Sequence, residues 1–135
     1  MDYLIGQLAK SANTDIETIR FYERRGLIPA PPRTSGGYRR YPAAEADRLR
    51  FIRRAKVLGF TLNEIGTLLK LQEGGDRHEV KSVAQTKLSE IEARIADLQS
   101  MRYTLTKLVN DCSGRGPVAG CPIIEALNSE EPHDA

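Results

Sequence analysis

The sequence predicts a mainly α-helical fold with one small hairpin, and three features of the 135-residue chain support this prediction. Apolar residues recur at helical spacing in two short segments before residue 26 and in two more between residues 43 and 74. Prolines interrupt residues 29–42, so helices cannot continue through this segment. Residues 79–110 contain neither proline nor glycine, which predicts one long helix of about 48 Å.

The first two helices are predicted to be joined by a tight turn. Residues 4–12 have an apolar face, and Asp15 is expected to cap a second helix, from Ile16 to Arg25, that ends at Gly26. Such a pair can place its second helix in the major groove of DNA, although the spacing also suits an ordinary helical hairpin. The polar side of the second helix is expected to carry Thr18, Arg20, Tyr22 and Arg24.

Residues 29–42 predict a two-stranded hairpin with Gly36 and Gly37 at its tip. Cations and aromatic rings are interleaved along it, at Arg33, Tyr38, Arg39, Arg40 and Tyr41. Because these side chains can grip a phosphate backbone, we favour that role over a surface hairpin with incidental charge.

The charge of the chain is unevenly distributed. Residues 1–60 hold twelve Lys and Arg against six Asp and Glu, whereas residues 61–135 hold eight against twelve. Clustered cations displace the counterions of nucleic acid, so the basic half is expected to bind a polyanion. A solvated basic helix face would have the same composition.

A second helical pair follows the hairpin, and a long helix follows that pair. We expect a helix from Ala43 to Leu58 and another capped by Thr61, with Glu64 completing a capping box. The long helix has an apolar heptad seam that is broken at Arg102 and consists of Ala84, Leu88, Ile91, Ile95, Leu98, Leu105 and Val109. A seam of this kind favours dimerisation over packing onto its own chain, but it does not reveal the direction of the partner helix.

Two cysteines flank a glycine-rich loop after the long helix. Pro122 suits the first helical position, so Cys121 is expected to cap a short helix, where backbone N–H groups lower the pKa of its thiol. Two thiolates, from Cys112 and Cys121, suit Cu(I)-like ions better than tetrahedral Zn(II). Taken alone, the pair fits a redox couple or incidental thiols equally well.

The sequence also predicts where the protein is located and what it does not do. We expect a cytoplasmic protein with reduced thiols, because no secretory leader and no membrane-spanning stretch of about 20 apolar residues is visible. No catalytic carboxylate pair, nucleophile with its base, or phosphate loop is recognisable, so we do not expect an enzyme.

The stretch IGQLAKSANTDIETIRFYERRGLIPAPPRTSGGYRRY resembles the helix-turn-helix and wing of the MerR family, in which T-I-R-F/Y-Y-E precedes G-L-I-P and G-Y-R-x-Y. The resemblance covers nearly the whole chain. It implies a winged helix-turn-helix domain, and a long helix that forms an antiparallel coiled coil in a homodimer. It also implies binding to double-stranded promoter DNA, which metal binding distorts so that RNA polymerase engages. The resemblance assigns DNA binding to Thr18, Arg20, Tyr22, Arg33, Tyr38, Arg39 and Arg40, and metal binding to Cys112 and Cys121.

The ending C-x8-C-P-I-I-E-A-L is similar to that of the metal-sensing branch of this family, which includes copper, zinc and mercury sensors. In that branch, divalent-metal members place a third cysteine at the start of the long helix, and monovalent-metal members commonly place serine. This chain has Arg77 there, and it lacks the extra Cys or loop His of zinc sensors. The resemblance therefore favours Cu(I), Ag(I) or Au(I), then two-coordinate Hg(II), with Zn(II) disfavoured. Arg77 could neutralise an anionic bis-thiolate complex or mark a site without metal specificity.

Some alternatives stay open at this point. His78 and His133 lack metal-ligand spacing to the cysteines, although His78 could approach from a partner chain. A thiol-redox or electrophile sensor without metal is the alternative function. The expected domains are 1–71 for DNA binding, 72–78 as linker, 79–111 for dimerisation, 112–127 for metal binding and 128–135 as a flexible tail.

Overall fold

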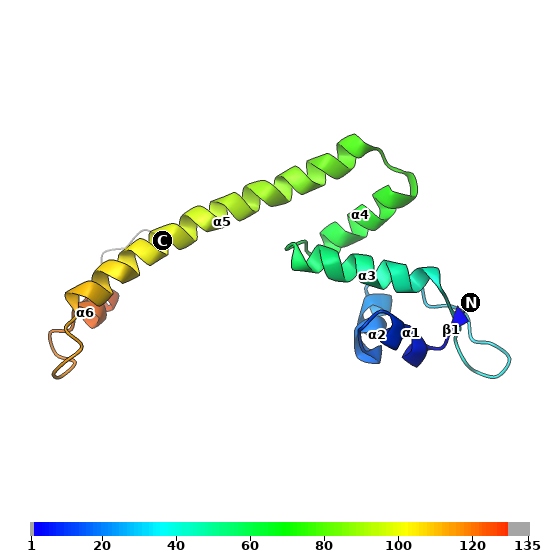
Figure 1. The fold of residues 1–135 in the computed structure, drawn as a ribbon, viewed down its shortest axis with the longest axis horizontal. Coiled ribbons are helices and arrows are strands. Elements are labelled where there is room, and N and C mark those ends of the chain that lie inside the picture. Colours follow the sequence, from blue (N-terminus) through cyan, green and yellow to red (C-terminus); the bar gives the residue numbers. More distant parts are fainter. Residues whose placement is uncertain (1, 130–135) are drawn as a thin grey trace. The chain divides into compact units, whose positions relative to one another are not determined.

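The structure is a computed structural model that describes residues 2–129, and these residues form helices and one small sheet (Figure 1). The chain divides between Val83 and Ala84, inside the long helix, into two compact units. The predicted mainly helical fold is confirmed. Most of the predicted tail, 128–135, lies outside the described residues, and His133 lies outside them too.

The helix-turn-helix at the start of the first unit is formed by α1 (Ile5–Ser11) and α2 (Ile16–Arg24). The Asp15 side chain caps α2 as predicted, accepting a hydrogen bond of 2.7 Å from the backbone N–H of Thr18. That hydrogen bond lowers the pKa of the Asp15 carboxyl. Asn13 closes the turn with a φ of 56°, in the left-handed region that Asn tolerates better than most residues.

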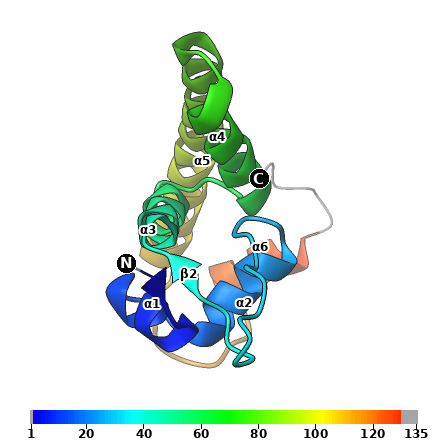
Figure 2. The same ribbon diagram turned by 90° about the vertical axis from the view of Figure 1, so that its right-hand side faces the viewer.

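The predicted hairpin is less regular than a two-stranded ribbon. Residues 33 and 39 form a single bridge, and Thr34 donates a backbone hydrogen bond of 2.6 Å to Tyr38. The returning strand, β2 (Tyr41–Pro42), pairs antiparallel with β1 (Asp2–Tyr3), which the sequence did not predict. The hairpin loop therefore runs from the end of α2 to a strand that is held by the start of the chain (Figure 2).

The second helical pair consists of α3 (Ala44–Val57) and α4 (Leu62–Gly74). The predicted capping box is confirmed, since Glu64 N–H donates to Thr61 Oγ1 at 3.2 Å and Thr61 N–H donates to Glu64 Oε1 at 2.7 Å. Only Gly75 and Asp76 separate α4 from α5, whereas the sequence suggested a linker over 72–78.

The hydrophobic core lies in the first unit. Side chains from α1, α2, β2, α3 and α4 meet there, and the largest fully buried ones are Leu8, Ile19, Ile28, Tyr41, Ile52 and Ile65. Because these side chains pack together, α2 and the base of the hairpin are held against one hydrophobic core. This core positions the candidate DNA-binding side chains.

The second unit contains most of the long helix α5 (Arg77–Asp111) and the short helix α6 (Pro122–Asn128). The seam of α5 is uncovered within the described part of the chain: Leu88, Ile95, Leu98, Leu105 and Val109 are 49–62% exposed. Within residues 2–129, no helix combines the length and the apolar character that crossing a membrane requires.

Candidate nucleic-acid interface and metal centre

A cavity of about 470 Å³ lies between α2, the start of α1 and the hairpin. Four of the side chains that the sequence assigned to DNA binding line it: Arg20 from α2, and Arg33, Tyr38 and Arg39 from the hairpin. The fold thus brings cations from two separate segments to one opening. Such a convergence of guanidinium groups suits the oxygens of a backbone phosphate.

The other three assigned residues lie elsewhere. Arg40 is exposed outside the cavity, and Thr18 is half-buried in the first turn of α2, where its backbone N–H donates to Asp15. Tyr22 is only 7% exposed and belongs to the core. Its ring therefore does not lie on the outer side of α2, where the sequence predicted it. The reason is helical spacing: Tyr22 follows the buried Ile19 by three residues and therefore shares its inward face.

Glu23 is a functional candidate that sequence reasoning missed. Its side chain is 8% exposed, and its carboxylate accepts hydrogen bonds from the Tyr41 hydroxyl at 2.5 Å and from Arg39 Nη1 at 3.4 Å. Burial, and then the Glu23 carboxylate, raises the pKa of Tyr41 to about 12. The signal was available, because Glu23 follows Ile19 by four residues and must also face inward.

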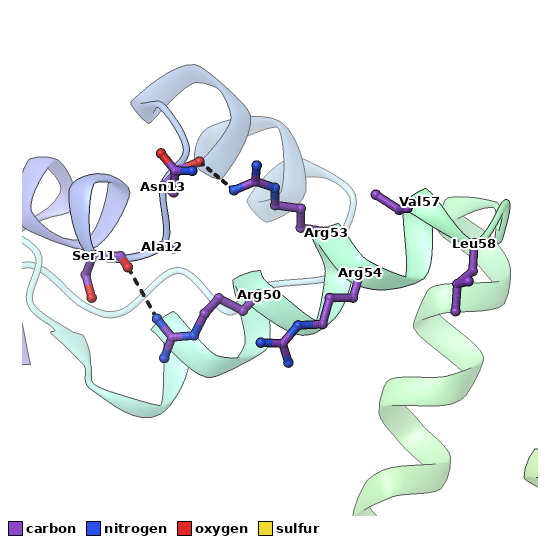
Figure 3. A pocket seen from close by; sticks show the side chains of 8 residues that line it. All are labelled: Ser11, Ala12, Asn13, Arg50, Arg53, Arg54, Val57 and Leu58. Atoms are coloured by element: carbon purple, nitrogen blue, oxygen red, sulfur yellow. Dashed lines mark hydrogen bonds between the residues drawn. The ribbon is translucent and has the colours of Figure 1, made fainter.

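Two arginines of α3 hold the turn between α1 and α2 (Figure 3). Arg50 Nη1 donates to the carbonyl oxygen of Ser11, and Arg53 Nη1 donates to that of Asn13, each at 3.3 Å. They line a second cavity, of about 520 Å³, beside the turn. The second helical pair therefore holds the helix-turn-helix in position by hydrogen bonds to the backbone of the turn.

The two cysteines meet in the second unit. Cys112 follows the end of α5, Cys121 is the N-cap of α6 as predicted, and their Sγ atoms are 3.9 Å apart without a disulfide. The loop between them turns back at Gly116 and Gly120, whose φ angles of 92° and 82° favour glycine. Each half-buried thiol is thus oriented toward the other.

The Cys121 thiol is set up to ionise. The backbone N–H groups of Ile124 and Ile123 lower its pKa, and the Cys112 thiol lowers it further, while slight desolvation and the nearby Glu125 carboxylate act in the opposite direction. A thiolate is the form that binds metal, so this local field favours binding of a soft cation.

The sulfur separation can be compared with simple coordination geometry. With metal–sulfur bonds of about 2.3 Å, two thiolates lie about 3.8 Å apart around a tetrahedral ion and about 4.6 Å apart around a linear one. The observed 3.9 Å is close to the bent arrangement, and a linear ion requires the loop to open slightly. Within the described residues no three His, Cys, Asp or Glu side chains cluster as a metal site, and Cys112 and Cys121 are the thiols that come together there.

Comparison with known proteins places these features in a context. The family model "MerR HTH family regulatory protein" matches residues 3–72, and "MerR, DNA binding" matches residues 46–108. The chain is 42% identical over 132 residues to a mercuric resistance operon regulatory protein from Serratia marcescens, covering 97% of this chain and 92% of that protein. It is 43% identical over 129 residues to the HTH-type transcriptional regulator ZntR from Escherichia coli (strain K12), covering 93% and 92% respectively.

A solved structure shows the same architecture. The transcription regulator PbrR691 from Ralstonia metallidurans CH34, in complex with lead(II), matches with a TM-score of 0.82 and 32% sequence identity. The match covers 91% of this chain and 97% of that one.

Proposed function

Because the chain belongs to the metal-sensing branch of the MerR family of transcriptional regulators, and is not an enzyme, we propose that it binds promoter DNA and activates transcription when a thiophilic metal ion binds Cys112 and Cys121. The observation that carries the DNA-binding half is the cavity lined by Arg20, Arg33 and Arg39. The observation that carries the sensing half is the thiol pair at 3.9 Å.

The DNA contacts that we propose divide into two kinds. The outer side of α2, with Thr18 and Arg20, approaches base edges and adjoining phosphates in the major groove. The hairpin of residues 29–42, called the wing from here on, contacts the phosphate backbone through Arg33, Tyr38, Arg39 and Arg40. Tyr22 supports α2 by packing in the core and makes no direct DNA contact in this proposal, because its side chain is buried.

We predict that Arg20→Ala reduces the salt dependence of DNA binding. Each lost phosphate contact should lower the steepness of log affinity against log salt concentration by about 0.9. Fluorescence anisotropy of a labelled duplex over a salt series measures this slope. Arg94→Ala is the matched control, since Arg94 is an exposed arginine of α5 and its loss should leave the slope unchanged. An Arg20→Ala slope equal to the wild-type slope would remove Arg20 from the interface.

The assembly that we propose is a homodimer held by an antiparallel coiled coil of α5. The uncovered apolar seam on this 35-residue helix supports a coiled coil, because exposed apolar side chains at heptad spacing gain stability by packing against a partner helix. The antiparallel direction is what the family resemblance implies. A dimer of this kind presents two helix-turn-helix units to the two half-sites of one promoter.

The ions that we propose are soft and bind few ligands. The number and softness of the two thiolates favour Cu(I), Ag(I) or Au(I), although a linear ion requires the sulfur atoms to move apart from 3.9 Å. Hg(II) comes next, supported by the similarity to mercuric resistance regulators. Zn(II) is less favoured because it is usually held by more donors than each protomer offers within its described residues. Arg77, exposed at the first residue of α5, takes no part in this ligand set.

The mechanism that we propose links the two halves through DNA shape. Metal binding changes the loop between Cys112 and Cys121, the dimer distorts the promoter to which it is bound, and RNA polymerase engages the distorted promoter. We place the protein in the cytoplasm, where reduced thiols remain available for metal.

A thiol-redox sensor is the second candidate, and the sulfur separation favours it too. Two thiols 3.9 Å apart can form a disulfide with little movement. A peroxide would accept the two electrons: the S–S bond forms, the O–O bond breaks, and two waters leave with the thiol protons.

A further inference from the structure

The cavity between α2 and the wing contains the carboxylate of Glu23. The phosphates of DNA, the proposed partner, would repel this negative charge. Glu23 is the one acidic residue among the described residues that line it, and the others include Arg20, Arg33 and Arg39. A carboxylate beside DNA phosphates opposes binding through like charge. Its presence on the helix that faces DNA therefore needs a compensating role.

Both hydrogen-bond donors to Glu23 come from the other side of the cavity. The Tyr41 hydroxyl belongs to β2, and Arg39 lies two residues before it, where the hairpin returns. Tyr41 is 1% exposed and the side chain of Glu23 is 8% exposed, so water competes little for these bonds. Charged hydrogen bonds that are shielded in this way are stronger than exposed ones. The carboxylate thus ties α2 to the wing.

Arg39 keeps donors for a second ligand. Its Nη1 contacts Glu23, while its side chain as a whole is still 39% exposed. A guanidinium carries five N–H donors in a rigid fork. One edge can therefore stay on Glu23 while another meets a phosphate oxygen in the cavity.

We propose that Glu23 is a positioning residue that fixes the spacing between α2 and the wing and thereby sets the preference of the protein for its operator over other DNA. This inference rests on the proposed DNA binding. Base edges are read by α2 while phosphates are held by the wing, so operator binding requires both at a fixed separation. Non-specific binding requires only cations near phosphates, and the loss of Glu23 removes none of them.

The test uses two duplexes: one selected by the wild-type protein from a random-sequence library, and poly(dI-dC). Glu23→Ala and Tyr41→Phe should each weaken binding to the selected duplex about tenfold, the size of one charged hydrogen bond. Binding to poly(dI-dC) should stay unchanged for Tyr41→Phe, and stay unchanged or tighten for Glu23→Ala, which removes a negative charge. Glu23→Gln should restore part of the preference, because its amide oxygen still accepts from Tyr41.

Two comparisons separate positioning from simple folding. The double variant Glu23→Ala/Tyr41→Phe should lose no more preference than Glu23→Ala alone, because the two side chains act on one contact. Tyr3→Phe is the matched control: its hydroxyl lies on the residue paired with Tyr41, accepts a bond of 3.5 Å from Ser11, and should not affect the preference.

Two results would overturn the inference. One is a parallel fall in affinity for both duplexes together with the melting temperature, which would make the cluster purely structural. The other is an unchanged preference in Glu23→Ala. If the wild-type protein bound neither duplex, the proposed DNA binding itself would fail, and that result is distinct from both.

Discussion

Replacing Cys112 and Cys121 by serine should abolish the transcriptional response to metal while leaving operator affinity unchanged. A serine hydroxyl is a hard, protonated donor and cannot replace a thiolate on a soft ion. Loss of a residue that merely supports a metal ligand costs about 10–100-fold in affinity, so loss of both ligands should cost more than about 100-fold. The cysteines belong to the second unit and are not part of the core that positions α2, so DNA binding should survive. In vitro transcription with and without metal measures the response.

Ser113→Ala is the matched control for the cysteine variant. Ser113 belongs to the same loop, and among residues 2–129 its hydroxyl hydrogen-bonds to the backbone of Arg115 alone. The metal response should persist in this variant. A response that also persists in the double cysteine variant would show that the ion binds elsewhere.

Ile95→Glu should separate the proposed dimer and weaken operator binding about 10²–10⁴-fold. Ile95 lies near the middle of the α5 seam and is 49% exposed in the single chain, so a charge there would be buried against the partner helix. A monomer also loses the high effective concentration with which the second subunit binds its half-site, which accounts for the size of the effect. Sedimentation and anisotropy measure the mass and the affinity.

Ala93→Glu controls for the added charge. Ala93 is exposed and lies on the same helix, about half a turn away from the seam, so this variant should remain dimeric. If Ile95→Glu were still a dimer with wild-type affinity, α5 would not be the dimerisation helix.

Much of the fold could be predicted because the helices have long, regular patterns. The cap at Asp15, the capping box at Thr61 and Glu64, and the cap at Cys121 are local features that depend only on neighbouring residues. The proline-free stretch that became α5 leaves the chain few alternatives. These local elements appear where the sequence placed them, within two residues.

The interactions that depend on distant segments were not predictable. The strand β1 has two residues, too few to show an alternating pattern, and it forms only because β2 returns beside it. Arg50 and Arg53 look like surface cations in the sequence, and their bonds to the turn appear only when α3 packs against α1. Tyr22 was misplaced for a simpler reason: its polarity suggested an outward face, whereas its spacing from Ile19 directs it inward. Glu23, which the sequence did not single out, has a side chain that is turned inward by the same spacing.

For the candidate metal centre, the sequence singled out both cysteines but did not predict their geometry. The sulfur separation of 3.9 Å depends on how the loop turns at its glycines, which no spacing rule fixes. Two thiolates favour soft ions as a class. Which soft ion binds depends on the coordination number and on any donor from a partner chain.

The most direct test of metal sensing is an anaerobic titration of the fully reduced protein with Cu(I), Hg(II) and Zn(II), followed by intact mass measurement. We expect each soft ion to saturate at one ion per pair of Cys112 and Cys121 and to bind more tightly than Zn(II). The double serine variant should lack this site. Binding that survives in that variant would contradict metal sensing through these cysteines. So would a wild-type protein that takes up no ion and, when exposed to peroxide, forms the Cys112–Cys121 disulfide and activates transcription without metal.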